Sequence, residues 1–206
     1  MRNGLLLALV AAPAWAEPVT VAALGDSLTA GYGLAQSEGF VPRMQAWLDA
    51  RGADVVLVNA GVSGDTTAGG LARLDWTLTP DVDGVIVALG GNDYLRGLDP
   101  AVPAGNLGRI LEGLQSRGVP ALLVGLEAGS NYGPEYRAAF DAIYRDLAAE
   151  YDVPLIKDWF DGVQAEGIPL SSVMQPDGIH PNARGVDLIV DEMGPAILDF
   201  VTTLQP

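Results

Sequence analysis

Two segments far apart in the sequence carry side chains that together could cleave an acyl bond. Ser27 lies in Gly-Asp-Ser-Leu at positions 25–28, directly after the apolar run Val19–Leu24. Serine is a weak nucleophile until a base takes its proton. The chain contains one histidine, His180, and Asp177 precedes it by three residues, so the two can share one turn. We therefore predict that Ser27 attacks, His180 takes its proton and Asp177 orients the imidazole.

Each of these residues also has a simpler structural interpretation. Asp26 or Ser27 could cap the next helix, because both side chains accept hydrogen bonds from the first amides of a helix. His180, which precedes Pro181, could likewise cap the last helix. The residues that follow the neighbouring strands are what favours chemistry over capping.

Donors for a developing oxyanion are expected after the second and third apolar runs. Gly64 follows Val55–Ala60, and Asn92 follows Gly84–Leu89. The carboxyl ends of parallel strands meet at one edge of a sheet, so both residues should lie near Ser27. The amides of Ser27 and Gly64 and the side-chain amide of Asn92 would then form an oxyanion hole. Taken singly, Gly64 is an ordinary turn residue and Asn92 an ordinary helix cap, and it is their convergence that favours chemistry.

Five apolar runs alternate with helical patterns, which predicts an α/β fold with a five-stranded parallel sheet between two layers of helices. The last two runs are Ala121–Leu126 and Val153–Ile156. The unbroken run Val55–Ala60 suggests a strand covered on both faces, whereas the proline in Val153–Ile156 suggests an edge strand. The leucine spacing predicts one helix over Thr67–Leu78, and a closing helix is expected from Ala183 to Leu204.

The amino terminus has the parts of a secretory signal peptide. One arginine precedes the apolar segment Leu5–Ala12, and the small-x-small site Ala-Trp-Ala follows at positions 14–16. The apolar segment is too short to span a bilayer, so we expect cleavage after Ala16 and no stable membrane insertion. Residues 17–206 would then form a single domain in the periplasm or outside the cell, with a monomer favoured.

The composition argues against several classes of partner and cofactor. The formal net charge of the 206-residue chain is −15, which repels nucleic acid and anionic membrane surfaces at long range. The chain has no cysteine and therefore neither disulfides nor a thiolate metal site, and a single histidine argues against catalytic zinc. We expect no metal, no cofactor and no nucleic-acid partner.

The motifs described above resemble the four blocks of the SGNH (GDSL) hydrolases. These are Gly-Asp-Ser-Leu at 25–28, Ser-Gly-Asp-Thr at 63–66, Gly-Gly-Asn-Asp at 90–93 and Asp-Gly-Ile-His at 177–180. Their order and spacing resemble those of the branch that contains thioesterase I, lysophospholipase L1 and bacterial arylesterases. The segments 59–66, 70–74, 95–97 and 131–133 are similar to the same branch, so the resemblance covers nearly all of residues 17–206.

The resemblance implies a flavodoxin-like sheet and an enzyme without metal or cofactor. It implies hydrolysis of carboxylic esters and thioesters through an acyl-serine intermediate, with aryl, short-to-medium acyl or lipid esters, lysophospholipids among them, as substrates. Ser27, Gly64, Asn92, Asp177 and His180 match the family's functional positions one by one.

A substrate loop is expected at Gly129, Ser130, Asn131 and Tyr132, where relatives of this branch contact the acyl chain. This chain departs from the branch just before Asn131, because Ala128-Gly129-Ser130 stands where a proline is usual. The preferred chain length therefore stays open.

Two alternative functions also stay open. The same five residues could serve a carbohydrate deacetylase or an acyltransferase, although the similarity between the blocks favours an esterase. A secreted binding protein could keep the fold without catalysis, and the loss of a catalytic residue would indicate it. None of the five is lost.

Overall fold

The computed structural model describes residues 17–165 and 168–205, so the signal peptide expected at residues 1–16 lies outside the described part of the chain. The fold is built on one five-stranded parallel sheet with the strand order β2-β1-β3-β4-β5. This order is that of flavodoxin-like doubly wound sheets. The predicted fold class is therefore confirmed. The strands are β1 (Val19–Gly25), β2 (Val55–Gly61), β3 (Gly84–Ala88), β4 (Ala121–Val124) and β5 (Leu155–Ile156).

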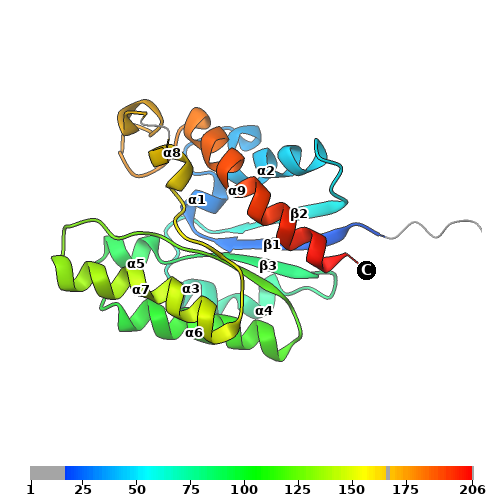
Figure 1. Cartoon of the computed structure of the whole chain (residues 1–206), viewed down its shortest axis with the longest axis horizontal. Helices are drawn as coiled ribbons and strands as arrows, with labels where there is room; N and C mark the ends of the chain where they lie inside the picture. Colours follow the sequence, from blue (N-terminus) through cyan, green and yellow to red (C-terminus); the bar gives the residue numbers. More distant parts are fainter. Residues whose placement is uncertain (1–16, 166–167, 206) are drawn as a thin grey trace, which may run out of the picture.

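Helices form one layer on each face of the sheet (Figure 1). The upper layer in this view contains α2 (Phe40–Asp49), α8 (Asp161–Ala165) and α9 (Ala183–Leu204). The lower layer contains α3 (Thr67–Ala72), α4 (Leu74–Thr77), α5 (Gly91–Leu95), α6 (Ala101–Ser116) and α7 (Pro134–Tyr151). The single-turn helix α1 (Ser27–Ala30) directly follows β1, and short 3-10 turns cover Gln36–Glu38 and Leu170–Ser172. The closing helix has the bounds that the sequence predicts.

The central strands are apolar on both faces, because successive side chains point into different layers. In β1, Val21 and Ala23 pack with α2 and α9, whereas Ala22 and Leu24 pack with the layer of α6 and α7. In β3, Ile86 likewise packs in the core with α2 and α9, whereas its neighbours Val85 and Val87 pack in the core with α6 and α7. Each of these two central strands thus contributes side chains to both cores.

The prediction that the second strand is covered on both faces is wrong. Val56 and Val58 are 45% and 40% exposed, while Val55 and Leu57 on the other face are buried against α2 and α9. β2 is an edge strand. The long helices α6 and α7 lie on the same face of the sheet as Val56 and Val58, but they contact β4 and the opposite edge strand β5 and leave β2 uncovered on this face. The edge position predicted for the strand in the proline-containing run Val153–Ile156 is confirmed, because β5 is the last strand of the sheet and directly follows Pro154.

The prediction of a single helix over Thr67–Leu78 is also wrong, because this segment forms two helices, α3 and α4, that are separated at Arg73. The Arg73 backbone leaves the helical region with φ −108° and ψ 10°. Its guanidinium donates to the carbonyls of Gly25 and Ala60 at 2.8 and 2.7 Å and to Asp65 at 2.7 Å. These bonds fasten the helix junction to the carboxyl ends of β1 and β2, where the candidate site lies.

The exposed edge of β2 is closed by a side chain from α2. The Gln45 amide donates to the Val55 carbonyl at 2.9 Å and accepts from the Leu57 amide at 2.7 Å. It therefore pairs with the strand as the peptide group of a sixth strand would. Unpaired edges favour aggregation, and this bond pair covers part of the edge.

We expect Gln45→Ala to lower the free energy of unfolding by about 1–3 kcal/mol, because it leaves two partly buried backbone groups without a partner. Chemical denaturation of the variant measures this loss. Gln115→Ala on α6 is the control and should change stability by less than about 0.5 kcal/mol. Equal stability of the two variants would show that the edge does not need the Gln45 bonds.

Candidate active site

The switch point of the sheet, between β1 and β3, holds the turn that carries Ser27. Ligand sites of doubly wound folds lie at this point, outside the carboxyl ends of the strands. Asp26 is the N-cap of α1, and its Oδ1 accepts from the Leu28 amide at 3.0 Å. The simpler role considered for Asp26 is therefore real, and it makes Ser27 the first residue of the helix with its hydroxyl free for another partner.

The hydroxyl of Ser27 contacts His180, which lies 153 residues further along the chain. Ser27 Oγ is 2.8 Å from His180 Nε2, and His180 Nδ1 is 2.7 Å from Asp177 Oδ2. The His180 hydrogen bond, followed by bonds from the amides of Ile179 and His180, lowers the Asp177 pKa to about 2. An ionised carboxylate only accepts hydrogen bonds, so Nδ1 carries the proton and Nε2 accepts from Ser27.

Gln175 and Tyr32 hold the histidine segment against the serine segment. The Gln175 amide donates to the His180 carbonyl at 2.7 Å, and its side chain donates to the Tyr32 carbonyl at 2.8 Å. The Tyr32 ring lies on the imidazole, with 4.7 Å between the ring centroids. Sequence reasoning missed both residues. The glycine-broken loop around Tyr32 was the available signal, but nothing in it identifies the contact.

Asn92 is the second residue of α5, and its side chain faces the Ser27 turn. Asn92 Nδ2 donates to Asp26 Oδ2 at 3.2 Å and keeps a second hydrogen for another acceptor. Asp26 is 3% exposed, and this burial raises its pKa to about 6, although bonds from Leu28 and Asn92 oppose the shift. One buried carboxylate thus connects the Ser27 turn to Asn92.

Gly64 lies in the loop between β2 and α3, next to the end of β1. The Val62 amide donates to the Gly25 carbonyl at 3.0 Å, which brings this loop beside the Ser27 turn. Gly64 has φ +83°, a value that favours glycine. Its carbonyl accepts from Arg96 Nη2 at 2.7 Å. The structure therefore places Gly64, Asn92 and Ser27 directly after the carboxyl ends of β2, β3 and β1, at the edge that the sequence predicts.

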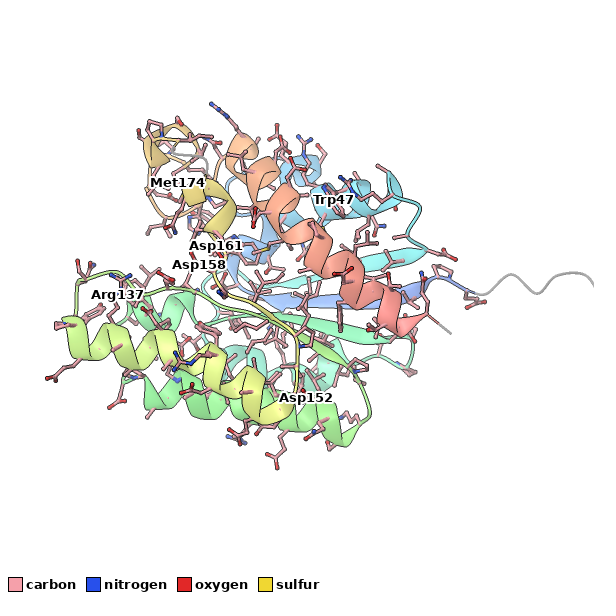
Figure 2. The ribbon with its side chains drawn as sticks, viewed as in Figure 1. Trp47, Arg137, Asp152, Asp158, Asp161 and Met174 are labelled. Atoms are coloured by element: carbon pink, nitrogen blue, oxygen red, sulfur yellow. The ribbon has the colours of Figure 1, made fainter. Side chains whose placement is uncertain are left out.

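An apolar cavity of about 380 Å³ borders Ser27 and Asn92. Its wall comes from the loops after β1, β3 and β4 and from the segment between β5 and α9. In Figure 2, Met174, which lines the cavity, lies near α8 in the upper layer, whereas Arg137 lies on α7 in the lower layer. The apolar side chains of the wall are Leu28, Tyr94, Leu95, Leu126, Phe160, Leu170, Met174 and Ile179.

Only part of the predicted substrate loop reaches this cavity. Gly129 lines it, whereas Ser130, Asn131 and Tyr132 lie outside the wall. The Tyr132 ring packs edge-on against Tyr94 with 5.8 Å between centroids, so it supports the wall from behind. A side chain at position 129 would meet the Tyr94 hydroxyl at 2.5 Å, which explains a glycine there.

A buried carboxylate stabilises the polar end of the cavity. Asp158 Oδ1 accepts from the Glu127 amide at 3.0 Å, and Oδ2 accepts from the Gln164 side chain at 3.1 Å. Burial raises the Asp158 pKa to about 6. Asp158 and Asp161 lie where the chain leaves the sheet for α8 (Figure 2). Glu127 and Gln164 both line the cavity, so Asp158 joins two of its walls.

Other features of the described residues do not add to this site. A second cavity of about 550 Å³ lies at the amino ends of β4 and β5, between α6, α7 and α9, and its lining includes neither serine nor histidine. Within residues 17–165 and 168–205, no cluster of three potential metal ligands occurs. In the same residues, no helix has the length and apolar character that crossing a membrane requires.

Comparison with known proteins places the chain among ester hydrolases. The model of the GDSL-like Lipase/Acylhydrolase family matches residues 23–188. Esterase TesA of Pseudomonas aeruginosa is 38% identical over 192 residues, which cover 93% of this chain and 94% of the relative. The thioesterase 1/protease 1/lysophospholipase L1 of Escherichia coli K12 is 38% identical over 88% of this chain and 85% of its own length. The crystal structure of esterase EstA from Pseudoalteromonas sp., inhibited by monoethylphosphonate, superposes with a TM-score of 0.81 at 34% identity, covering 89% and 99% of the two chains.

The raised pKa of Asp26 predicts a pH-dependent loss of stability. The folded-state pKa of about 6 exceeds the ordinary value of 3.8, so the folded state binds more protons between these values. Stability therefore falls as the pH rises through this window, and the full cost of about 3 kcal/mol is present above about pH 6. The difference in unfolding free energy between wild type and Asp26→Asn, measured from about pH 4 to about pH 7, should fall by that amount. Asp146→Asn, on the exposed surface of α7, is the control. If the difference in unfolding free energy between wild type and Asp26→Asn did not change with pH, the raised pKa of Asp26 would be contradicted.

Proposed function

Because the chain belongs to the GDSL-like lipase/acylhydrolase family and is an ester hydrolase of that family, we propose that it cleaves carboxylic esters through an acyl-serine intermediate on Ser27. The observation that carries this proposal is the hydrogen-bonded series Ser27–His180–Asp177 beside an apolar cavity. A nucleophile, its base and the group orienting the base are the parts that acyl transfer needs.

Acylation starts when Ser27 Oγ attacks the ester carbonyl carbon. The hydroxyl proton moves to His180 Nε2, and Asp177 stabilises the imidazolium through its bond to Nδ1. The carbonyl oxygen becomes an oxyanion that accepts from the amides of Ser27 and Gly64 and from the Asn92 side chain. Ser27 is the first residue of α1, so its amide has no acceptor within the helix and is free for this task.

The alcohol leaves as the tetrahedral intermediate collapses, and it takes the proton from His180 Nε2. A water molecule then donates its proton to the same nitrogen and attacks the acyl-serine carbonyl. A second tetrahedral intermediate is stabilised by the same donors. Its collapse releases the carboxylic acid and returns the proton from His180 to Ser27 Oγ.

The cavity beside Ser27 supports an acyl group as the part of the substrate that is recognised. Its wall is mostly aliphatic and aromatic, so it removes apolar surface from water when an acyl chain binds. We propose aryl and short-to-medium acyl esters as substrates, with thioesters and lysophospholipids as further candidates because the Escherichia coli relative bears those names. The exposed surface of this wall is mostly apolar, which favours an acyl chain over a sugar and disfavours a carbohydrate deacetylase.

We also propose export from the cytoplasm, on the strength of the apolar segment and the small-x-small site within residues 1–16. The substrate would then be a small-molecule or lipid ester outside the cytoplasm. The remaining residues 17–206 would act as one domain, and we favour a monomer.

Ser27→Ala should abolish ester hydrolysis, because the nucleophile is lost. We expect kcat to fall by several powers of ten, roughly 10⁶ as for a serine hydrolase triad. Turnover of p-nitrophenyl acetate and hexanoate measures the loss, and labelling by a reactive ethylphosphonate should disappear with it. Ser116→Ala on α6 is the control, and circular dichroism checks that both variants fold. Turnover by Ser27→Ala at more than a small fraction of the wild-type rate would contradict the proposal.

The rate of the Asp177→Asn variant tests the orienting role of Asp177. Its pKa of about 2 keeps Asp177 ionised in the working range, so it can orient the imidazole and stabilise the imidazolium throughout that range. Asp177→Asn removes this charge and the acceptor that fixes the tautomer. We expect a loss of roughly 10⁴ in kcat, with the fold retained. Turnover of p-nitrophenyl acetate from about pH 6 to about pH 8 measures the loss. An unchanged rate would assign the orienting role elsewhere.

A further inference from the structure

We propose that Arg96 is a positioning residue for the oxyanion hole, because its guanidinium binds the Gly64 carbonyl and thereby holds the Gly64 amide in line with Asn92. This inference rests on the proposed function, in which Gly64 and Asn92 stabilise the oxyanion. Arg96 itself touches no reacting atom in this account. It acts through the residue that it holds.

The turn around Gly64 is closed by the Asp65 amide, which donates to the Val62 carbonyl at 3.0 Å, but nothing packs on Gly64 from the side on which a Cβ would stand. Gly64 is exposed, and a Cβ built on it would meet no atom within 4 Å. Glycine is also the residue with the greatest backbone freedom. Oxyanion donors must lie about 2.7–3.1 Å from the developing charge, so a small displacement of the Gly64 amide would weaken its effect. The 2.7 Å bond from Arg96 Nη2 fixes the carbonyl side of Gly64.

Arg96 is suited to this task because it lies one turn after Asn92. Its amide donates to the Asn92 carbonyl at 3.1 Å, and residues four apart lie on the same face of a helix. One face of α5 therefore presents a donor to the oxyanion and also holds the second donor in place. Among the described residues, Arg96 forms no ion pair. The Gly64 carbonyl is therefore the main partner of its exposed guanidinium.

The base of α5 is fixed by a separate buried contact. Asp93 is fully buried and accepts from the Thr67 amide and hydroxyl at 2.8 and 2.6 Å. Thr67 opens α3, directly after the loop that carries Gly64. Asp93 thus sets the distance between α5 and this loop, and Arg96 adds the bond to Gly64 itself. The loss of Arg96 should release Gly64 without unfolding the loop.

Arg96→Ala should therefore lower kcat and leave KM nearly unchanged, because the support matters most when charge develops. We expect a fall of roughly 10- to 100-fold in kcat on p-nitrophenyl acetate, less than the loss of a whole oxyanion donor. Low-millimolar guanidinium chloride, compared with sodium chloride, should restore part of the rate by binding at the vacated position. Arg145→Ala on the outer surface of α7 removes the same charge and is the control, with wild-type kcat expected.

Three results would overturn the inference. The first is a kcat for Arg96→Ala equal to that of Arg145→Ala. The second is an Arg96→Ala rate that guanidinium does not raise above the sodium chloride control. The third is a higher KM for the anionic substrate mono-p-nitrophenyl succinate with an unchanged kcat on the neutral acetate, which would make Arg96 a substrate-binding residue. The Ser27→Ala variant separates these failures from a failure of the proposed function, because its loss of activity does not depend on Arg96.

Discussion

The rest of the site depends on the buried carboxylate of Asp26, which joins the first and third strands at the switch point of the sheet. One oxygen accepts from the Leu28 amide and shapes the turn that presents Ser27, while the other accepts from the Asn92 side chain. Burial makes the ionised form costly, as the raised pKa of Asp26 shows. The fold tolerates this cost because the carboxylate holds the Ser27 turn and the Asn92 side-chain amide next to each other.

The same solution recurs around the carboxyl edge of the sheet. Loops that leave strand ends have amides without partners in the sheet, and buried amides require acceptors. Aspartates supply them: Asp93 accepts from Thr67, Asp158 from Glu127, and Asp177 from its own turn. The acidic composition of the chain thus has a local structural use at this edge. Asp177 alone among these also faces an imidazole, which is why its pKa is lowered where burial raises that of Asp158.

The sequence was sufficient for features that depend on neighbouring residues. Apolar runs predicted all five strands, and the three-residue spacing of Asp177 and His180 predicted their contact. It was insufficient where a contact joins distant segments. The open face of β2 depends on where α6 and α7 pack, and the break at Arg73 coincides with bonds to two strand ends. The contact of Tyr32 with His180 and the bond of Arg96 to Gly64 are equally long-range, so no local pattern predicted them.

The segments that hold Ser27, Gly64 and Asn92 differ from the segment that forms much of the cavity wall. This separation explains how one site could accept different acyl groups without a change in chemistry. Ser27, Gly64 and Asn92 follow the first three strands and are held by carboxylates and arginines of that half of the sheet. Much of the cavity wall instead belongs to the segment between β5 and α9, which contributes Phe160, Leu170, Met174 and Ile179. Asn182, the N-cap of α9, donates to the carbonyls of Ser172 and Met174 at 3.1 and 3.3 Å and so anchors this wall from outside the cavity. Side chains of this wall can therefore vary in size while Ser27, Gly64 and Asn92 keep their supports.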